Sequence, residues 1–305
     1  MLIDEHRRPI WWVAVLALAV VLMSQTAPAQ TTQPQWKRTE GGDLILRSFQ
    51  HAPYPHASRE KGYQGKSKFF PKEGHYDDST VGIFIPQSFS PRQRTNYIIH
   101  FHGHATVVER AMRIHRLAEQ VAASKANAIL IVPQGPKEAS DSGCGKLELE
   151  QGGAKALLEE VGQFLLSENR MTSAALGNIV LSAHSGGYKV TGAVLDHGGI
   201  TEHVTDVLLL DATYGSLEQF SAWCCNGSQR RLVSIFTDHL KDENQTLMEL
   251  LRKGNIDYSL LQEKSATPEA LMQRQPIFIP TSLAHNDVPM KTDYFRRLLE
   301  TSGLK

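Results

Sequence analysis

The sequence is poor in several features that would assign it to a particular class of protein. It has only three cysteines, and Lys plus Arg balance Asp plus Glu at 32 residues each. This balance excludes a general electrostatic attraction to nucleic acid or to an anionic membrane surface. Internal repeats and long low-complexity tracts are also missing, which excludes a repeat architecture. A composition of 41% hydrophobic and 21% charged residues is that of an ordinary globular protein.

The sequence also lacks an apolar run long enough to cross a membrane. Its longest run, residues 10–23, falls short of the roughly twenty residues that span a bilayer. Arg7 and Arg8 precede this run and small residues at 27–29 follow it, an order typical of a cleavable export signal. Removal of such a signal would leave a periplasmic or extracellular protein without stable membrane insertion. We therefore expect an export signal at 1–29, a flexible lead at 30–42 and one folded domain at 43–305.

The three cysteines lie in the part of the chain that would be exported. In an oxidising compartment Cys144 would pair with Cys224 or Cys225. A bond between the adjacent Cys224 and Cys225 would be strained. No cysteine ends a predicted strand with a histidine partner in view, so the sequence does not favour a cysteine nucleophile.

Apolar runs alternate along the chain with segments of helical period. Strands that alternate with helices indicate a mostly parallel sheet covered on both faces. The first two strands have no helix between them, which predicts an antiparallel edge. The predicted strands are 43–49, 81–85, 97–101, 128–132, 178–182, 206–210, 232–236 and 277–280. The predicted helices are 107–121, 154–165, 187–195, 217–223, 245–253 and 293–299.

The most informative segment is residues 179–190, where an apolar run ends in a serine between small residues. Ala183 and Gly187 stand two positions to either side of Ser185, so the pattern is A-x-S-x-G, one methyl from G-x-S-x-G. A sharp strand-to-helix turn needs such small neighbours, because the backbone and flanking side chains approach closely there. The pattern predicts an exposed nucleophile at Ser185; the alternative is a bystander serine in a glycine-rich loop.

A serine hydroxyl is a poor nucleophile by itself, so it needs a general base, an acid that orients the base, and donors for an oxyanion. The sequence offers Ser185, an aspartate and His285 in this order, after a His-Gly turn at 102–103. In this order of elements, residues 80–300 resemble the α/β-hydrolase superfamily, in its branch of serine esterases, lipases and peptidases. The resemblance implies an eight-stranded, mostly parallel sheet with helices on both faces, and a secreted serine hydrolase that needs no cofactor or metal.

The resemblance also implies which groups act as base and as oxyanion donors. His285 follows the last predicted strand and precedes the final helix, where the superfamily places its base. The backbone N–H groups of His104 and Gly186 would form the oxyanion hole. One follows the His-Gly turn after the strand at 97–101, and the other directly follows the nucleophile.

Two aspartates compete for the role of the acid. Asp211 follows the predicted strand 206–210, and Asp238 follows the predicted strand 232–236. The superfamily most often takes its acid after the seventh strand, which favours Asp238 or the nearby Asp242, but some members take it after the sixth. We favour Asp211, because its Asp-x-x-Tyr-Gly turn resembles a motif of secreted bacterial hydrolases that carry His-Ser-Gly-Gly-Tyr. Asp238 stays the alternative.

Two functions of other classes stay open. His100, His102 and His104 alternate, so a continued strand would place three imidazoles on one face, as a zinc-dependent hydrolase requires. Gly103 argues against this alternative, because it indicates that the strand ends early. A non-catalytic binding protein would keep the same scaffold without the chemistry. For the serine hydrolase we expect a small-molecule or peptide-like acyl substrate, either an ester or an amide, and no nucleic-acid partner.

Residues 50–76 do not fit the alternation of strands and helices. Their positive charges outnumber their negative ones and are interleaved with aromatic residues. We expect a solvated connection with some aromatic side chains packed against the core. The alternative is a loop that holds a carboxylate or a sugar. The segment carries Arg59, Lys61, Lys66, Lys68 and Lys72 against Glu60 and Glu73, with Tyr54, Tyr63, Phe69, Phe70 and Tyr76 between them.

Overall fold

The computed structural model describes residues 35–227 and 229–304. The predicted export signal at 1–29 and the first residues of the predicted lead lie outside this range. Within the described range, no helix is both long and apolar enough to span a membrane.

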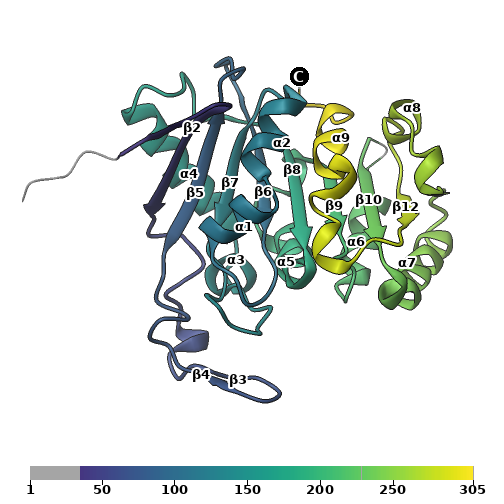
Figure 1. The fold of residues 1–305 in the computed structure, drawn as a ribbon, viewed down its shortest axis with the longest axis horizontal. Coiled ribbons are helices and arrows are strands. Elements are labelled where there is room, and N and C mark those ends of the chain that lie inside the picture. The colour runs from purple at the N-terminus through teal and green to yellow at the C-terminus, as the bar shows by residue number, and fades with distance from the viewer. Residues whose placement is uncertain (1–34, 228, 305) are drawn as a thin grey trace, which may run out of the picture. The chain divides into compact units, whose positions relative to one another are not determined.

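A ten-stranded sheet forms the centre of the described residues, with the strand order β1-β2-β5-β7-β6-β8-β9-β10-β12-β11 (Figure 1). From β7 to β11 neighbouring strands are parallel, whereas β1, β2 and β5 form an antiparallel edge. The strands are β1 (Lys37–Thr39), β2 (Gly42–Ser48), β5 (Thr80–Pro86), β6 (Thr95–Phe101), β7 (Ile129–Pro133), β8 (Leu176–His184), β9 (Val204–Leu210), β10 (Arg231–Phe236), β11 (Ser259–Leu260) and β12 (Ile277–Pro280). A separate hairpin pairs β3 (Tyr63–Gln64) with β4 (Phe69–Phe70).

All eight predicted strands are present, and the predicted antiparallel edge is confirmed. The two further strands, β1 and β11, are only three and two residues long, too short to show as apolar runs. β1 lies inside the segment that we expected to be a flexible lead at 30–42. It is ordered because it pairs antiparallel with β2, Thr39 facing Gly42 across the tight turn.

Helices cover both faces of the sheet (Figure 1). Successive residues of the central strands point to opposite sides, so Leu181 and Leu209 join one core while Val180 and Leu208 join the other. The first core contains residues of α3 to α7, and the second contains residues of α1, α2, α8 and α9. The helices are α1 (Val108–Ile114), α2 (Leu117–Ser124), α3 (Gly145–Leu149), α4 (Gly153–Ser167), α5 (Tyr188–His197), α6 (Leu217–Cys225), α7 (Lys241–Lys253), α8 (Pro268–Leu271) and α9 (Tyr294–Glu300).

The single helix predicted at 107–121 is two helices, α1 and α2. Arg116 separates them, because its φ of 51° is left-handed and cannot continue a right-handed helix. After this break α2 packs against α9, whereas α1 packs against β5 and β7. The apolar period runs through both helices, so the pattern does not reveal the break.

The predicted pairing of Cys144 with Cys224 or Cys225 is wrong, since all three thiols are free. Cys144 directly precedes α3, and the other two cysteines end α6. Helix α5 packs against both α3 and α6 and so lies between the two sets. Burial raises the pKa of the Cys144 and Cys224 thiols, which makes them poor nucleophiles.

Arg231 joins the end of the sheet to the last helices. Its guanidinium is fully buried and donates to the Asp206 carboxylate at 2.5 Å and to the Leu298 carbonyl at 2.7 Å. Arg274 pairs with the same carboxylate at 3.0 Å. One buried ion pair therefore connects strands β9 and β10 with helix α9. Removal of either charged side chain would leave the other charge buried without a partner.

We expect Asp206→Asn to destabilise the fold by about 3 kcal/mol or more, because it leaves the Arg231 guanidinium buried without a carboxylate. Urea denaturation followed by circular dichroism measures the change. Glu138→Gln, which removes an exposed pair with Arg110, is the matched control and should leave the midpoint nearly unchanged. Equal midpoints for both variants would contradict this role of the buried pair.

Candidate active site

Ser185 stands at a sharp turn between β8 and α5. Its φ of 52° is left-handed, a conformation that a non-glycine residue adopts only where the surroundings enforce it. The short helical turn Ser185–Gly187 follows at once and leads into α5. The predicted strand-to-helix turn is thus present, and it leaves the serine partly exposed at the carboxyl end of a central strand.

The glycines around this turn are needed for space. A Cβ on Gly187 would lie 2.4 Å from the Phe101 carbonyl oxygen, and a Cβ on Gly103 would lie 2.7 Å from the Ser185 Cβ. Both distances are shorter than real Cβ contacts. The turn of β8 and the loop after β6 can therefore approach each other only because these positions carry no side chain.

Asp211 and His285 meet beside Ser185. The two atoms His285 Nδ1 and Asp211 Oδ2 are 2.6 Å apart, and the carboxylate is fully buried. Because a carboxylate only accepts, Nδ1 carries the proton, and the other ring nitrogen, Nε2, is left free to accept one. Ser185 and His285 line the same pocket, of about 410 Å³. This is the tautomer that a general base for a serine requires.

Of the two competing aspartates, the structure brings Asp211 to His285 and leaves Asp238 exposed in the turn after β10. The neighbouring Thr237 explains the difference. Its backbone N–H donates to Asp211 Oδ1 at 2.8 Å, and its hydroxyl lies 3.0 Å from Oδ2. The loop after β10 thus contributes a donor to the carboxylate rather than an acid of its own.

Of the two expected oxyanion donors, Gly186 directly follows Ser185, and His104 lines the same pocket as Ser185. Gly186 is the second residue of the helical turn, where an N–H group has no acceptor in its own helix. A Cβ on Gly186 would lie 2.6 Å from the His104 ring, so the loop after β6 closes over the turn of β8. The His104 side chain is anchored on Ser142, with 2.7 Å between Nε2 and Oγ.

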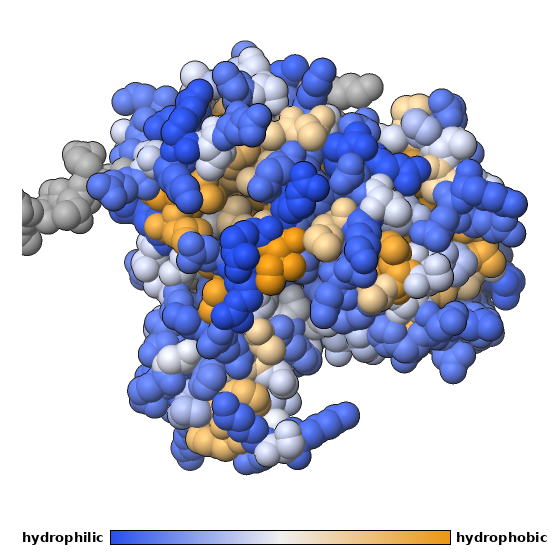
Figure 2. Space-filling model, viewed as in Figure 1, coloured by the Kyte–Doolittle hydropathy of each residue, from blue (hydrophilic) through white to orange (hydrophobic). Residues whose placement is uncertain are grey.

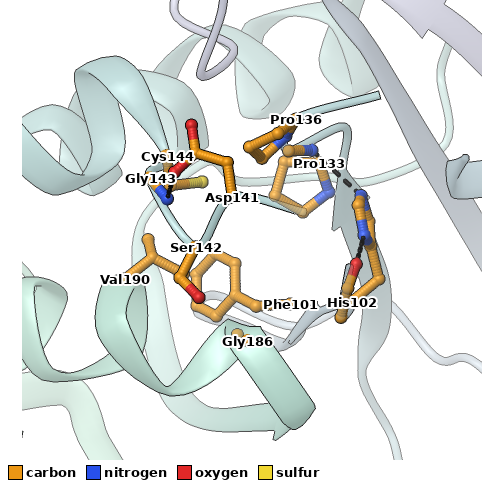
Figure 3. A pocket seen from close by; sticks show the side chains of 13 residues that line it. Phe101, His102, Pro133, Pro136, Asp141, Ser142, Gly143, Cys144, Gly186 and Val190 are labelled. Carbon is orange, nitrogen blue, oxygen red and sulfur yellow. Dashed lines mark hydrogen bonds between the residues drawn. The ribbon is translucent and has the colours of Figure 1, made fainter. Parts of the chain in front are cut away.

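A small cavity lies among these loops, lined by Gly103, Gly186 and the segment Asp141–Cys144 (Figure 3). Its volume of about 20 Å³ is that of roughly one water molecule. His102 holds the adjoining loop, since its Nδ1–H donates to the Gly103 carbonyl at 2.8 Å and its Nε2 accepts from the Gly135 N–H at 3.0 Å (Figure 3).

The arrangement required by the zinc alternative is not formed. Both ring nitrogens of His102 are used in hydrogen bonds, His100 bonds to Ser182, and His104 bonds to Ser142. In the described part of the chain, the group that could hold a metal is Asp211, His239 and His285, whose ligand atoms lie within 4.8 Å of one another. In that group Asp211 and His285 already bond to each other.

Sequence reasoning missed His239 as a neighbour of the site. The Thr237 hydroxyl lies 2.6 Å from His239 Nδ1, and the Tyr214 hydroxyl lies 2.8 Å from His239 Nε2. Tyr214 in turn interacts with Ser185; burial raises the pKa of its phenol, and the contact with Ser185 opposes this. Hydrogen bonds therefore link Tyr214 to Asp211 through His239 and Thr237. The Tyr-Gly turn after Asp211 was the only signal in the sequence for this side of the site.

Buried histidines pack behind His285. The His184 ring lies 4.7 Å from the rings of both His285 and His115, centroid to centroid. The His184 Nε2–H also donates to the His285 carbonyl at 3.2 Å. Burial lowers the pKa of His115 to about 4 and the pKa values of His184 and His100 well below their ordinary range. These rings are neutral at pH 7.

No family model matches the chain, and no curated protein matches its sequence, whereas many solved structures match its fold. The feruloyl esterase module from Clostridium thermocellum, complexed with sinapinate, has 10% identity and a TM-score of 0.52, over 88% of this chain and 93% of that one. A structure described as FAE has 10% identity and a TM-score of 0.51, over 86% and 89%. The chain therefore has the α/β-hydrolase fold that the sequence predicts, with ten strands rather than eight.

We expect the fold to lose stability as the pH falls from 6.5 to about 4. In this window His115 is protonated in the unfolded chain but neutral in the folded one, so protons favour unfolding. The shift of His115 from 6.5 to about 4 corresponds to about 3 kcal/mol. Urea denaturation at a series of pH values measures this dependence.

His115→Phe keeps a ring at this position and removes its titration, so the pH dependence should become shallower. Part of the dependence should persist, because His184 and His100 are also held neutral. A variant with the same slope as the wild type would show that His115 does not contribute.

Proposed function

We propose that the protein is a serine hydrolase that transfers an acyl group from an ester or amide to Ser185 and then to water. The observation that supports this proposal best is the 2.6 Å hydrogen bond between His285 Nδ1 and the buried Asp211 carboxylate, made beside a serine in a strained strand-to-helix turn. Each of the three residues comes from a different loop at the carboxyl ends of the strands.

In the first half of the reaction, Ser185 Oγ attacks the carbonyl carbon of the substrate. The hydroxyl proton moves to His285 Nε2, because Nδ1 keeps its own proton for Asp211. The imidazolium that forms is stabilised by the carboxylate, which stays ionised. Collapse of the tetrahedral intermediate breaks the bond to the leaving group, which takes the proton from Nε2.

In the second half, water attacks the acyl group on Ser185 and gives a proton to His285. The proton then returns to the Ser185 oxygen as the acid product leaves. In both halves a negative charge develops on the carbonyl oxygen, and the N–H groups of His104 and Gly186 would stabilise it. The position of Gly186 directly after Ser185, at the start of a helical turn, supports the second of these donors.

The surroundings of Asp211 fit the role of an orienting acid. Thr237 supplies two donors, its N–H and its hydroxyl, to a carboxylate that has no contact with solvent. Such hydrogen bonds replace the water that a buried carboxylate has lost. His239, on the other side of Thr237, uses its ring to hold Tyr214 beside Ser185, which further fixes the nucleophile.

The likeness to esterase structures supports a hydrolase in general but no particular substrate, since it concerns the fold alone. The zinc alternative has weaker support, because His100, His102 and His104 bond to separate partners. A non-catalytic binding protein would not require the strained Ser185 and the oriented His285 together. We also propose that the protein acts after export, as residues 1–29 indicate.

Ser185→Ala should reduce the hydrolysis of short-chain aryl esters at least about a thousandfold and abolish labelling by a fluorophosphonate, because the attacking oxygen is removed. Ser282→Ala, an exposed serine in the loop of His285, is the matched control and should keep both. A chelator should leave turnover unchanged. Turnover that survives in Ser185→Ala would refute the serine mechanism.

Asp211→Asn should lower kcat by roughly 10⁴, since the amide no longer holds the His285 ring in the required tautomer. Asp238→Asn, an exposed neighbour in the next loop, should leave kcat close to the wild-type value. Melting curves by circular dichroism separate a catalytic defect from unfolding. Equal, mild effects of the two substitutions would refute the assignment of Asp211.

A further inference from the structure

A second cavity, of about 620 Å³, adjoins the pocket of Ser185; we call it the hairpin cavity. His104 lines both spaces. One wall of the hairpin cavity comes from the β3–β4 hairpin, which projects from the body of the described residues (Figure 1). Another wall is Tyr188, which follows Ser185 by three positions. A substrate that extends past His104 would therefore occupy both spaces.

The charges that line the hairpin cavity do not balance. Arg59 is bound to Asp141, and Lys189 is bound to Glu148 at 2.7 Å. Lys66 and Lys68, in the turn of the hairpin, have no carboxylate partner among residues 35–227 and 229–304; Lys68 Nζ lies 5.3 Å from the centre of the Phe70 ring. The charged lining residues are Arg59, Lys66, Lys68, Lys189 and Asp141.

The carboxylate that lines the cavity, that of Asp141, is neutralised by its ion pair with Arg59. Arg59 donates from Nε and Nη2 to the two oxygens of Asp141, at 2.7 and 3.1 Å. The guanidinium also lies 4.9 Å from the centre of the Tyr63 ring. Burial would raise the pKa of Asp141, but the hydrogen bonds and charge of Arg59 and the hydrogen bond from the Gly143 N–H together lower that pKa. Asp141 therefore has its charge compensated, and the positive surplus comes from Lys66 and Lys68.

Aromatic side chains form the rest of the lining. Tyr63 and Phe70 come from the two strands of the hairpin and pair across it. The Tyr188 ring lies 5.9 Å from that of Tyr214, the residue beside Ser185. Flat apolar walls with two free ammonium groups suit a ring that carries an acid group, because the ring packs on the aromatic side chains while the ammonium groups hold the anion.

We propose that the hairpin cavity binds a carboxylate-bearing ring of the substrate, so that the protein prefers anionic esters. This inference rests on the proposed serine hydrolase function and adds the substrate class. Lys66 and Lys68 would select anionic over neutral substrates without taking part in the chemistry of Ser185. The alternative expectation for this segment, a loop that holds a carboxylate, is thereby preferred over a merely solvated connection.

The test compares kcat/KM for matched anionic and neutral esters at low ionic strength. One pair, 4-acetoxybenzoate and its methyl ester, carries the charge on the leaving group. The other, the mono-4-nitrophenyl ester of terephthalate and its methyl ester, carries the charge on the acyl group. For at least one pair, Lys66→Met and Lys68→Met should each reduce the anionic-to-neutral ratio by about two- to fivefold, the usual range for exposed ion pairs. The double variant should reduce it about tenfold.

Lys61→Met is the matched control, since Lys61 is an exposed lysine of the same segment outside the cavity lining, and it should keep the wild-type ratio. Added sodium chloride should lower the ratio of the wild type but not that of the double variant, because salt screens the attraction. Neutral esters should be hydrolysed equally by all of these variants.

The outcomes separate the two proposals. If the wild type hydrolyses neutral esters but the double variant has the same anionic-to-neutral ratio, the hairpin cavity does not select anions, and the serine hydrolase proposal stands. If Ser185→Ala hydrolyses the esters as fast as the wild type, the proposed function itself fails.

Discussion

The hydrogen bond between the Asp211 carboxylate and the His285 ring is the interaction on which the arrangement of the site depends. The two residues follow β9 and β12, and Thr237 follows β10, the strand between them. Its N–H and hydroxyl complete the shell of donors around the carboxylate. A buried carboxylate is costly unless it is bonded in this way. The ends of three neighbouring strands are therefore held together at one group.

The space behind His285 is filled by uncharged rings. His184 packs against both His115 and His285, and burial keeps His184 and His115 neutral. A charged group in this place would compete with Asp211 for its influence on His285. The same burial lowers the stability of the fold in acid, because protonation of these rings favours the unfolded chain.

Residues 50–76 combine a small aromatic core with exposed lysines in the turn of the hairpin. Tyr54, Phe70 and Tyr76 form a small core of their own with Ala139, which confirms that aromatic residues of the segment are packed. The surface of Figure 2 shows the hairpin as a separate lobe, with hydrophilic residues at its tip. By anchoring one end of the segment, this core places Lys66 and Lys68 over the cavity beside His104.

The sequence by itself determined the eight main strands, the turn at Ser185 and the order in which the site residues occur. These features depend on local patterns, since an apolar run or a small residue acts on its immediate neighbours. Only the tertiary structure decided which aspartate meets His285, that Arg116 splits a helix, and that the cysteines stay apart. These three features depend on contacts between loops and helices that lie far apart in the chain, and a local sequence pattern does not contain such contacts.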